Sequence, residues 1–243
     1  MATFVLVHGA MHGGWCWREV DAPLRAAGHT VFTPTLSGQG DRRHQLTRDI
    51  GVDTHVDDIA ELLWFEDLHD VHLVLHSYAG VLAGPIAERA GDRLASITYL
   101  AGFLTSPGEC LLDVEPADTV AHYRQLVADA GDGWRVPAST AFLAQWGVTD
   151  ALAPFVGARL TDFPYKCQTD PTQYDPSRWE ALRKIYVRHT DPPLASLDLS
   201  HQRAVDAGFE LHELACGHDV MLADPAGTIM VLEQVVVSAP RGR

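Results

Sequence analysis

The 243-residue sequence predicts an α/β fold in which a mostly parallel sheet is covered by helices on both faces. One observation is the alternation of short apolar, β-prone runs with longer helix-like stretches, joined by short connections. A second observation is the segment 105–180, which is rich in proline and shows no strand-like run. The sequence therefore predicts a core formed by residues 1–104 and 181–243, interrupted by a helical cap insertion at 105–180.

The N-terminal part of the core supplies most of the predicted strands. Pro34 ends the second strand, and Gly91 follows a helix as a C-cap glycine would. The predicted strands cover 3–7, 29–33, 71–75 and 97–101, and the predicted helices cover 15–27, 53–68 and 78–90.

The C-terminal part continues the alternation after the insertion. We expect strands at 184–187 and 210–214, helices at 196–207 and 223–237, and helices near 117–130 and 148–160 inside the insertion. Many of the aromatic residues fall in the insertion. An insertion between parallel strands emerges at the carboxyl edge of the sheet, where ligands bind, so we expect a lid over the site. The same aromatic side chains also suit a small core of the insertion itself.

The charge balance excludes several classes of partner. Lys and Arg number 18 against 32 Asp and Glu, a formal net charge of −14. Nucleic acids and anionic membranes are bound by clustered Lys and Arg, so we expect neither as a partner. The four cysteines form no C-x-x-C pair, the N-terminus resembles a strand, and no apolar stretch approaches the roughly 20 residues of a membrane span. These features predict a cytoplasmic protein.

Ser77 lies between the apolar strand 71–75 and a helix-forming run, the strand–turn–helix setting of a nucleophile elbow. The surrounding G-x-S-x-G pattern is altered, because Leu75 and Ala79 stand where small residues allow the helix to cross the strand. Leu75 is the larger departure. A serine that only caps an ordinary helix is the alternative.

The loop after the first strand, 8–14 (His-Gly-Ala-Met-His-Gly-Gly), is rich in glycine. Glycines let backbone N–H groups point into a cavity, where they can stabilise an oxyanion. His8 and His12 have the i, i+4 spacing of a helical metal pair, but the glycines disfavour a helix there. We therefore predict neither a metal nor another cofactor.

His218 follows the strand-like run 210–214 and can reach a serine near the middle of the sheet. Asp191, after the strand at 184–187, could orient that imidazole. The order Ser77, Asp191, His218 is typical of one large superfamily of hydrolases.

The chain resembles the α/β-hydrolase superfamily, and more narrowly the plant methylesterase and hydroxynitrile lyase branch with its bacterial, actinobacterial-type relatives. The resemblance lies in 4–10 (Phe-Val-Leu-Val-His-Gly-Ala), 12–17 (His-Gly-Gly-Trp-Cys-Trp), 23–24 (Pro-Leu), 27–29 (Ala-Gly-His), 73–80 (Leu-Val-Leu-His-Ser-Tyr-Ala-Gly) and 217–219 (Gly-His-Asp). It covers almost the whole core, whereas the insertion matches poorly.

The resemblance implies Ser77 as nucleophile, His218 as base and Asp191 as the acid of a catalytic triad. Asp191 lies one residue closer to its strand than the family pattern has it, which leaves Asp198 as a substitute. The implied oxyanion hole is formed by the backbone N–H groups of Ala10 and Tyr78. Candidate substrate contacts are His12, Met11, Trp134 and Trp146. Dimers are common in such families, so a homodimer is a further expectation.

Two positions separate the chemistries of this branch. The lyases of this branch resemble one another in having a threonine just after the first histidine and a lysine just after the catalytic histidine. This chain has Gly9 at the first position and Asp219 at the second. Without the lysine, no cation holds a departing cyanide. We therefore expect a serine hydrolase that cleaves a small to medium, uncharged, apolar or aromatic ester through an acyl-enzyme. A cyclase, a lyase or a ligand-binding protein on the same scaffold is the alternative.

Overall fold

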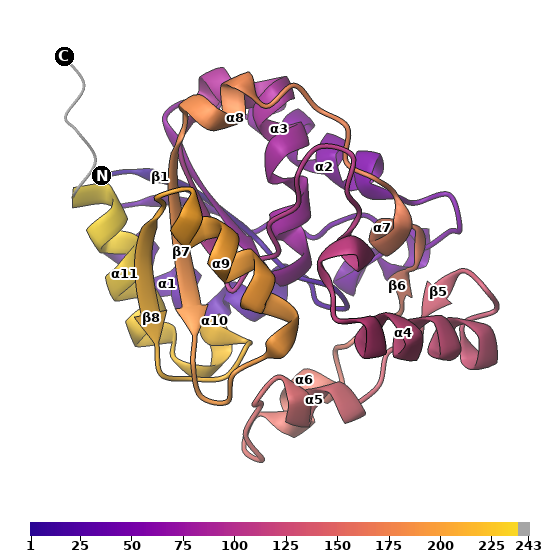
Figure 1. Cartoon of the computed structure of the whole chain (residues 1–243). Coiled ribbons are helices and arrows are strands. Elements are labelled where there is room, and N and C mark those ends of the chain that lie inside the picture. The colour runs from indigo at the N-terminus through magenta and orange to yellow at the C-terminus, as the bar shows by residue number, and fades with distance from the viewer. Residues whose placement is uncertain (238–243) are drawn as a thin grey trace.

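The computed structural model describes residues 1–237 and contains a six-stranded sheet in which every pairing is parallel (Figure 1). The strand order is β2-β1-β3-β4-β7-β8. The strands are β1 (Thr3–Val7), β2 (Thr30–Phe32), β3 (Val71–His76), β4 (Leu94–Leu100), β7 (Arg183–His189) and β8 (Glu210–Leu214). The central strand β3 is buried along its whole length, which explains why it appears in the sequence as a continuous apolar run. The predicted α/β fold with a mostly parallel sheet is confirmed.

Helices cover both faces of this sheet. The helix α1 packs against α11, and α2 packs against α3. In Figure 1, α9 and α11 lie on opposite sides of β7 and β8. The core helices are α1 (Arg18–Ala26), α2 (Val52–Phe65), α3 (Ala83–Ala90), α9 (Asp198–Asp206), α10 (Val220–Ala223) and α11 (Pro225–Val237).

Several helices begin later than the sequence pattern predicts, because a 3-10 turn comes first. The turn η1 (Gly14–Trp17) precedes α1, and η3 (Ser77–Leu82) precedes α3. The single helix predicted for 223–237 begins as α10 and restarts at Pro225. Proline has no N–H to continue a helix, but it suits the first turn of a new one.

The segment between β4 and β7 contains short helices and one small antiparallel pair, β5 (Arg135–Val136) with β6 (Phe163–Pro164). The expectation that this segment holds no strand is therefore wrong. Strands of two residues, one of them a proline, produce no periodic pattern in a sequence. The helical elements are η5 (Leu111–Val114), α4 (Ala117–Ala130), α5 (Ala141–Gln145), α6 (Ala153–Gly157), α7 (Lys166–Thr169) and α8 (Ser177–Ala181). Of the helix predicted at 148–160, only α6 is helical, and turns lie on both sides of it.

The strand order creates a crevice at the carboxyl edge of the sheet. The chain passes from β1 to β2 on one side of β1, and β3 then pairs on the other side. The carboxyl ends of β1 and β3 are therefore neighbours at the point where the winding direction reverses, which is where α/β sheets bind ligands. Among residues 1–237, no helix has the length and apolar character needed to cross a membrane.

Candidate active site

Ser77 occupies a sharp turn between β3 and η3. Its backbone φ is +53°, a left-handed conformation that costs energy for a residue other than glycine and that occurs in nucleophile elbows. Leu75 is fully buried inside β3, opposite Val7 and Tyr99, so the core accommodates its side chain. The close approach falls at Gly80 instead, where a Cβ would lie 2.3 Å from the carbonyl oxygen of Phe103.

The structure brings His218 to Ser77 across the sheet edge. Nε2 of His218 lies 2.9 Å from Oγ of Ser77, so the hydroxyl can donate its proton to the imidazole. The backbone N–H of His218 donates to the carbonyl of Trp146 at 2.7 Å, which anchors the loop that follows β8. Burial, together with His76 and His189 nearby, holds the pKa of His218 well below its usual range. The ring is therefore neutral at pH 7 and free to accept a proton.

Two backbone N–H groups border the same space. Ala10 and Tyr78 both line the pocket around Ser77. No acceptor is found for the N–H of Ala10 within the described residues, and Tyr78 lies in the first turn of η3, where N–H groups lack an intrahelical acceptor. A Cβ at Gly9 would lie only 2.7 Å from Cβ of Ser77, so glycine at this position lets the β1 loop approach the nucleophile.

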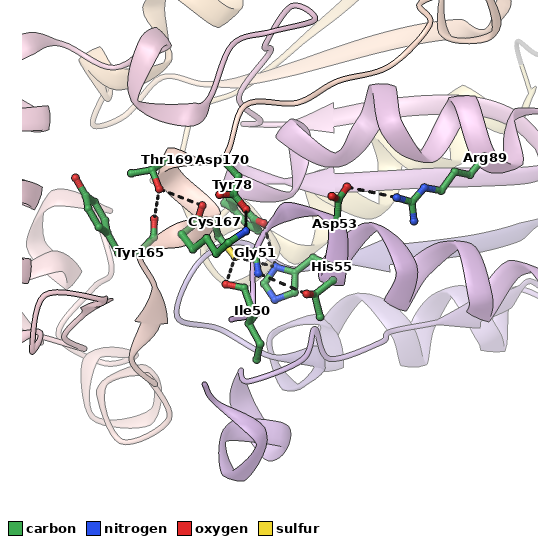
Figure 2. Close-up of polar contacts among 12 residues, drawn as sticks. Ile50, Gly51, Asp53, His55, Tyr78, Arg89, Tyr165, Cys167, Thr169 and Asp170 are labelled. Carbon is green, nitrogen blue, oxygen red and sulfur yellow. Dashed lines mark hydrogen bonds and ion pairs between the residues drawn. The ribbon is translucent and has the colours of Figure 1, made fainter. Parts of the chain in front are cut away.

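The side chain of Tyr78 is held by a buried cluster that includes His55 and Cys167 (Figure 2). Its hydroxyl lies 3.0 Å from Nδ1 of His55, whose Nε2–H donates to the carbonyl of Ser37 at 2.9 Å. Because Nε2 carries the proton, Nδ1 accepts the hydrogen bond from Tyr78. Sγ of Cys167 lies 3.6 Å from the same nitrogen, and burial raises the pKa of this thiol to about 12. The cluster fixes the residue whose N–H faces the site, and no pattern in the sequence indicates it.

Asp191 does not join Ser77 and His218. Asp191 is exposed, whereas Nδ1 of His218 is buried and has no hydrogen-bond partner within residues 1–237. The substitute acid, Asp198, is also exposed and pairs with Arg188 at 3.5 Å. The expectation that one of these carboxylates contacts the imidazole is therefore corrected, because both side chains lie at the surface.

A buried carboxylate lies in the pocket instead. Asp219 is 1% exposed, and its Oδ2 lies 3.2 Å from Nε2 of His12. Nδ1 of His12 lies 2.8 Å from the carbonyl oxygen of Ala10, so both ring nitrogens face acceptors and the ring is an imidazolium.

The pKa values of this pair move in opposite directions. Burial alone would lower the pKa of His12, but Asp219 and the Ala10 carbonyl raise it above its ordinary value. Burial would raise the pKa of Asp219, but His12 lowers it to about 2. The field of Asp219 also favours a proton on His218.

The predicted substrate contacts separate into two groups. His12 and Trp146 line the pocket with Ser77 and His218. Met11 does not; its backbone N–H donates to Oε1 of Gln39 and its carbonyl accepts from Thr161. Trp134 also lies elsewhere, at the start of the β5 strand with Arg48 and Arg135 over its ring. Sequence reasoning did not identify several lining residues from the insertion: Leu111, Glu115, Tyr123, Gln145, Phe163 and Gln168.

His8 does not form a metal pair with His12. Its Nδ1–H donates to the carbonyl of Gly9 at 2.8 Å, and its Nε2 accepts from the N–H of Leu36 at 3.0 Å. Both nitrogens are therefore used, and burial lowers the pKa of His8 to about 3. No group of three or more His, Cys, Asp or Glu residues arranged for a metal ion occurs among residues 1–237.

Comparisons with known proteins match part of the chain to curated esterases. A carbendazim hydrolyzing esterase from Nocardioides is 44% identical to this chain over 116 residues, which cover 48% of each chain. A methylesterase from Arabidopsis thaliana is 38% identical over 106 residues, covering 42% of this chain and 40% of that one. The chain therefore matches less than half of the length of these curated relatives.

The structural comparison extends over the whole chain. An extracellular α/β-hydrolase from a Paenibacillus species superposes with a TM-score of 0.84 and 22% identity, covering 100% of both chains. The model of the alpha/beta hydrolase family matches residues 4–230. That match includes every strand of the sheet, the elbow at Ser77 and the loop that carries His218. The chain belongs to the alpha/beta hydrolase family.

Proposed function

We propose that this protein is a carboxylic ester hydrolase that works through an acyl-enzyme on Ser77. The observation that carries the proposal is the 2.9 Å contact between Oγ of Ser77 and Nε2 of the neutral His218 ring, in a pocket that Ala10 and Tyr78 also line. The esterase names of the curated relatives support the same activity.

In the first half of the reaction, Nε2 of His218 takes the hydroxyl proton of Ser77 while Oγ bonds to the ester carbonyl carbon. The oxyanion of the tetrahedral intermediate accepts hydrogen bonds from the N–H groups of Ala10 and Tyr78. When the C–O bond of the ester breaks, His218 returns the proton to the leaving alkoxide. Water then attacks the acyl group by the same route, which releases the acid and restores Ser77.

The imidazolium that forms at His218 needs a compensating negative charge. No carboxylate contacts its Nδ1 within residues 1–237, so the triad acid of the family pattern is not supported here. Asp219 supplies negative charge through space, because it is buried, ionised and adjacent in the chain, and the paired His12 cation offsets part of its field at His218. Its pairing with His12 keeps it ionised in a site that would otherwise favour the neutral acid.

The pocket supports a small to medium ester. It is lined by the aromatic side chains Trp146, Phe163 and Tyr123 from the insertion, which suit an apolar or aromatic group. Because these side chains border Ser77, the insertion would act as the lid that excludes water during the reaction. The methylesterase names among the relatives favour a methyl ester.

Cyanide release is disfavoured because the described lining of the pocket offers no free cation to hold the departing ion. The imidazolium of His12 is paired with Asp219, and no lysine or arginine is among the lining residues.

The test is a burst experiment with p-nitrophenyl acetate. We expect one equivalent of p-nitrophenol to be released rapidly, and we expect the Ser77→Ala variant to lose both the burst and the steady turnover. A serine-directed phosphonate should label Ser77 alone. A folded protein that shows neither labelling nor turnover would overturn the proposal and favour a ligand-binding role.

A further inference from the structure

Two unpaired acceptor oxygens from the insertion belong to residues that line the pocket. Oε2 of Glu115 and Oε1 of Gln168 are buried and have no hydrogen-bond partner within residues 1–237. Both residues line the same pocket as Ser77 and His218, where Oδ1 of Asp219 and Nδ1 of His76 and His218 are also unpaired. Buried polar atoms in folded proteins are nearly always paired, so the two oxygens from the insertion indicate groups that a ligand satisfies.

Glu115 and Gln168 come from elements that pack together. Glu115 directly follows η5, Gln168 lies in α7, and these two elements are in contact. Gln168 is 3% exposed, so solvent reaches its side chain little in the free protein. The pair therefore forms a defined wall of the pocket.

The pocket offers no internal cation to this wall. No lysine or arginine is among the residues that line the pocket, and the imidazolium of His12 is paired with Asp219. The Ser196 hydroxyl, which also lines the pocket, hydrogen-bonds the Glu115 carboxyl, but Oε2 keeps no partner within residues 1–237. A donor for Oε2 can therefore come with the substrate.

We propose that Glu115, supported by Gln168, binds an N–H group carried by the acyl part of the substrate. This inference rests on the proposed esterase function and names its substrate class: neutral esters with an N–H donor remote from the scissile bond. The acceptors are carboxylate and amide oxygens, and an N–H group supplies what they lack without bringing a net charge. A plain hydrocarbon in the same position would leave both oxygens unpaired.

The test compares esters that differ only in this donor. Methyl 3-aminophenylacetate and methyl 4-aminophenylacetate are paired with the 3-methyl and 4-methyl compounds, because amino and methyl groups have nearly the same size. At pH 8 we expect kcat/KM to favour the amino ester of at least one pair by about tenfold, the range of a hydrogen bond to a charged group. We expect Glu115→Leu to abolish or reverse this preference, and Glu115→Gln to keep part of it, because its amide oxygen still accepts.

A matched control separates this role from a general effect of charge. Asp118 is an exposed acid three residues further along the chain, and Asp118→Asn should keep the preference of the unmodified protein. The same comparison is made as dissociation constants with the Ser77→Ala protein, which requires no hydrolysis. If hydrolysis is absent while the amino esters bind preferentially, the esterase proposal fails and the N–H subsite stands. Equal binding of both members of each pair, or a preference that survives in Glu115→Leu, overturns the subsite.

Discussion

The carboxylate of Asp219 lies 3.2 Å from Nε2 of His12, a residue 207 positions away, although Asp219 directly follows His218 in the chain. The contact ties the loop after β8 to the loop after β1. Both loops carry groups that we place in catalysis, and a buried ion pair joins them directly.

The first prediction concerns this pair. Asp219→Asn removes the charge that stabilises protonated His218 and leaves His12 buried beside a neutral amide. We expect kcat/KM to fall by about tenfold or more, and the free energy of unfolding to fall by about 3 kcal/mol, as is typical when one partner of a buried ion pair is lost.

A double-mutant cycle tests the coupling. The His12→Gln/Asp219→Asn protein should lose less stability than the sum of the two single variants, measured by urea unfolding. Additive losses would show that the two side chains do not stabilise each other.

The second prediction concerns Asp191. Because Asp191 is exposed and His218 Nδ1 is unpaired, Asp191→Asn should leave kcat within about threefold of the unmodified protein, whereas loss of a contacting triad acid costs about 10⁴-fold. Steady-state kinetics on p-nitrophenyl acetate decide this, with Ser77→Ala as the inactive reference. A loss of several thousand-fold would place Asp191 in a triad.

The third prediction concerns how the free energy of unfolding changes with pH. Burial lowers the pKa of His8 to about 3 and of His76 to about 4, so both are neutral in the folded protein where the unfolded chain is protonated. The unfolded chain therefore binds more protons between about pH 4 and 6.5, and stability rises with pH across that window.

The contribution of His12 to the pH dependence of stability has the opposite sign. Its raised pKa contributes stability that is fully present below pH 6.5 and is lost as the pH rises through the folded value.

His76 provides the test of the rise in stability. We expect His76→Gln to lower the slope of the unfolding free energy against pH, between pH 4 and 6.5, by about 1.4 kcal/mol per pH unit, the effect of one proton. An unchanged slope would mean that His76 is protonated in the folded protein.

The fourth prediction concerns the pH dependence of substrate preference. Burial raises the pKa of Glu115 to about 7, with Asp118 raising it further and the Ser196 hydroxyl lowering it. Tyr123 also faces this carboxyl from α4, and Gln168 lies in the neighbouring α7. The preference for amino over methyl esters should therefore grow between pH 6 and 8. His218 acts equally on both esters, so its titration cancels in the ratio, and the trend should vanish in Glu115→Leu.

The fifth prediction concerns the elbow. A Cβ at Gly80 would lie 2.3 Å from the carbonyl oxygen of Phe103 and 2.8 Å from its nitrogen, and backbone cannot move aside cheaply. Gly80→Ala should lower the free energy of unfolding by about 1–3 kcal/mol, the usual cost of overpacking. Gly133→Ala is the control for adding a methyl group in open space, although its positive φ adds a smaller backbone penalty. Thermal unfolding of both variants gives the comparison.

The sequence predicted the elements that depend on periodicity and local chemistry. Buried parallel strands appear as apolar runs, so β3 and β8 were found close to their true bounds. Ser77 and His218 were identified because an elbow and a strand end fix where their side chains point.

Other parts of the site depend on tertiary packing. Asp191 has the expected position after β7, but only the fold shows that its side chain faces outward. Glu115 and Gln168 belong to no motif, and they line one pocket because η5, which Glu115 follows, packs on α7. The hydrogen bond between Tyr78 and His55 joins residues 23 positions apart and leaves no periodic trace.

The close approach at Gly9 limits how this scaffold can be redesigned. Lyases of the resembling plant branch carry a hydroxyl side chain at the corresponding place, but here such a side chain would begin 2.7 Å from Cβ of Ser77. Ser77 cannot retreat, because its strained φ is set by β3 on one side and η3 on the other. Conversion of this protein into a lyase therefore requires the whole turn between β3 and η3 to be rebuilt, and exchange of positions 9 and 219 alone would leave a protein with a displaced nucleophile.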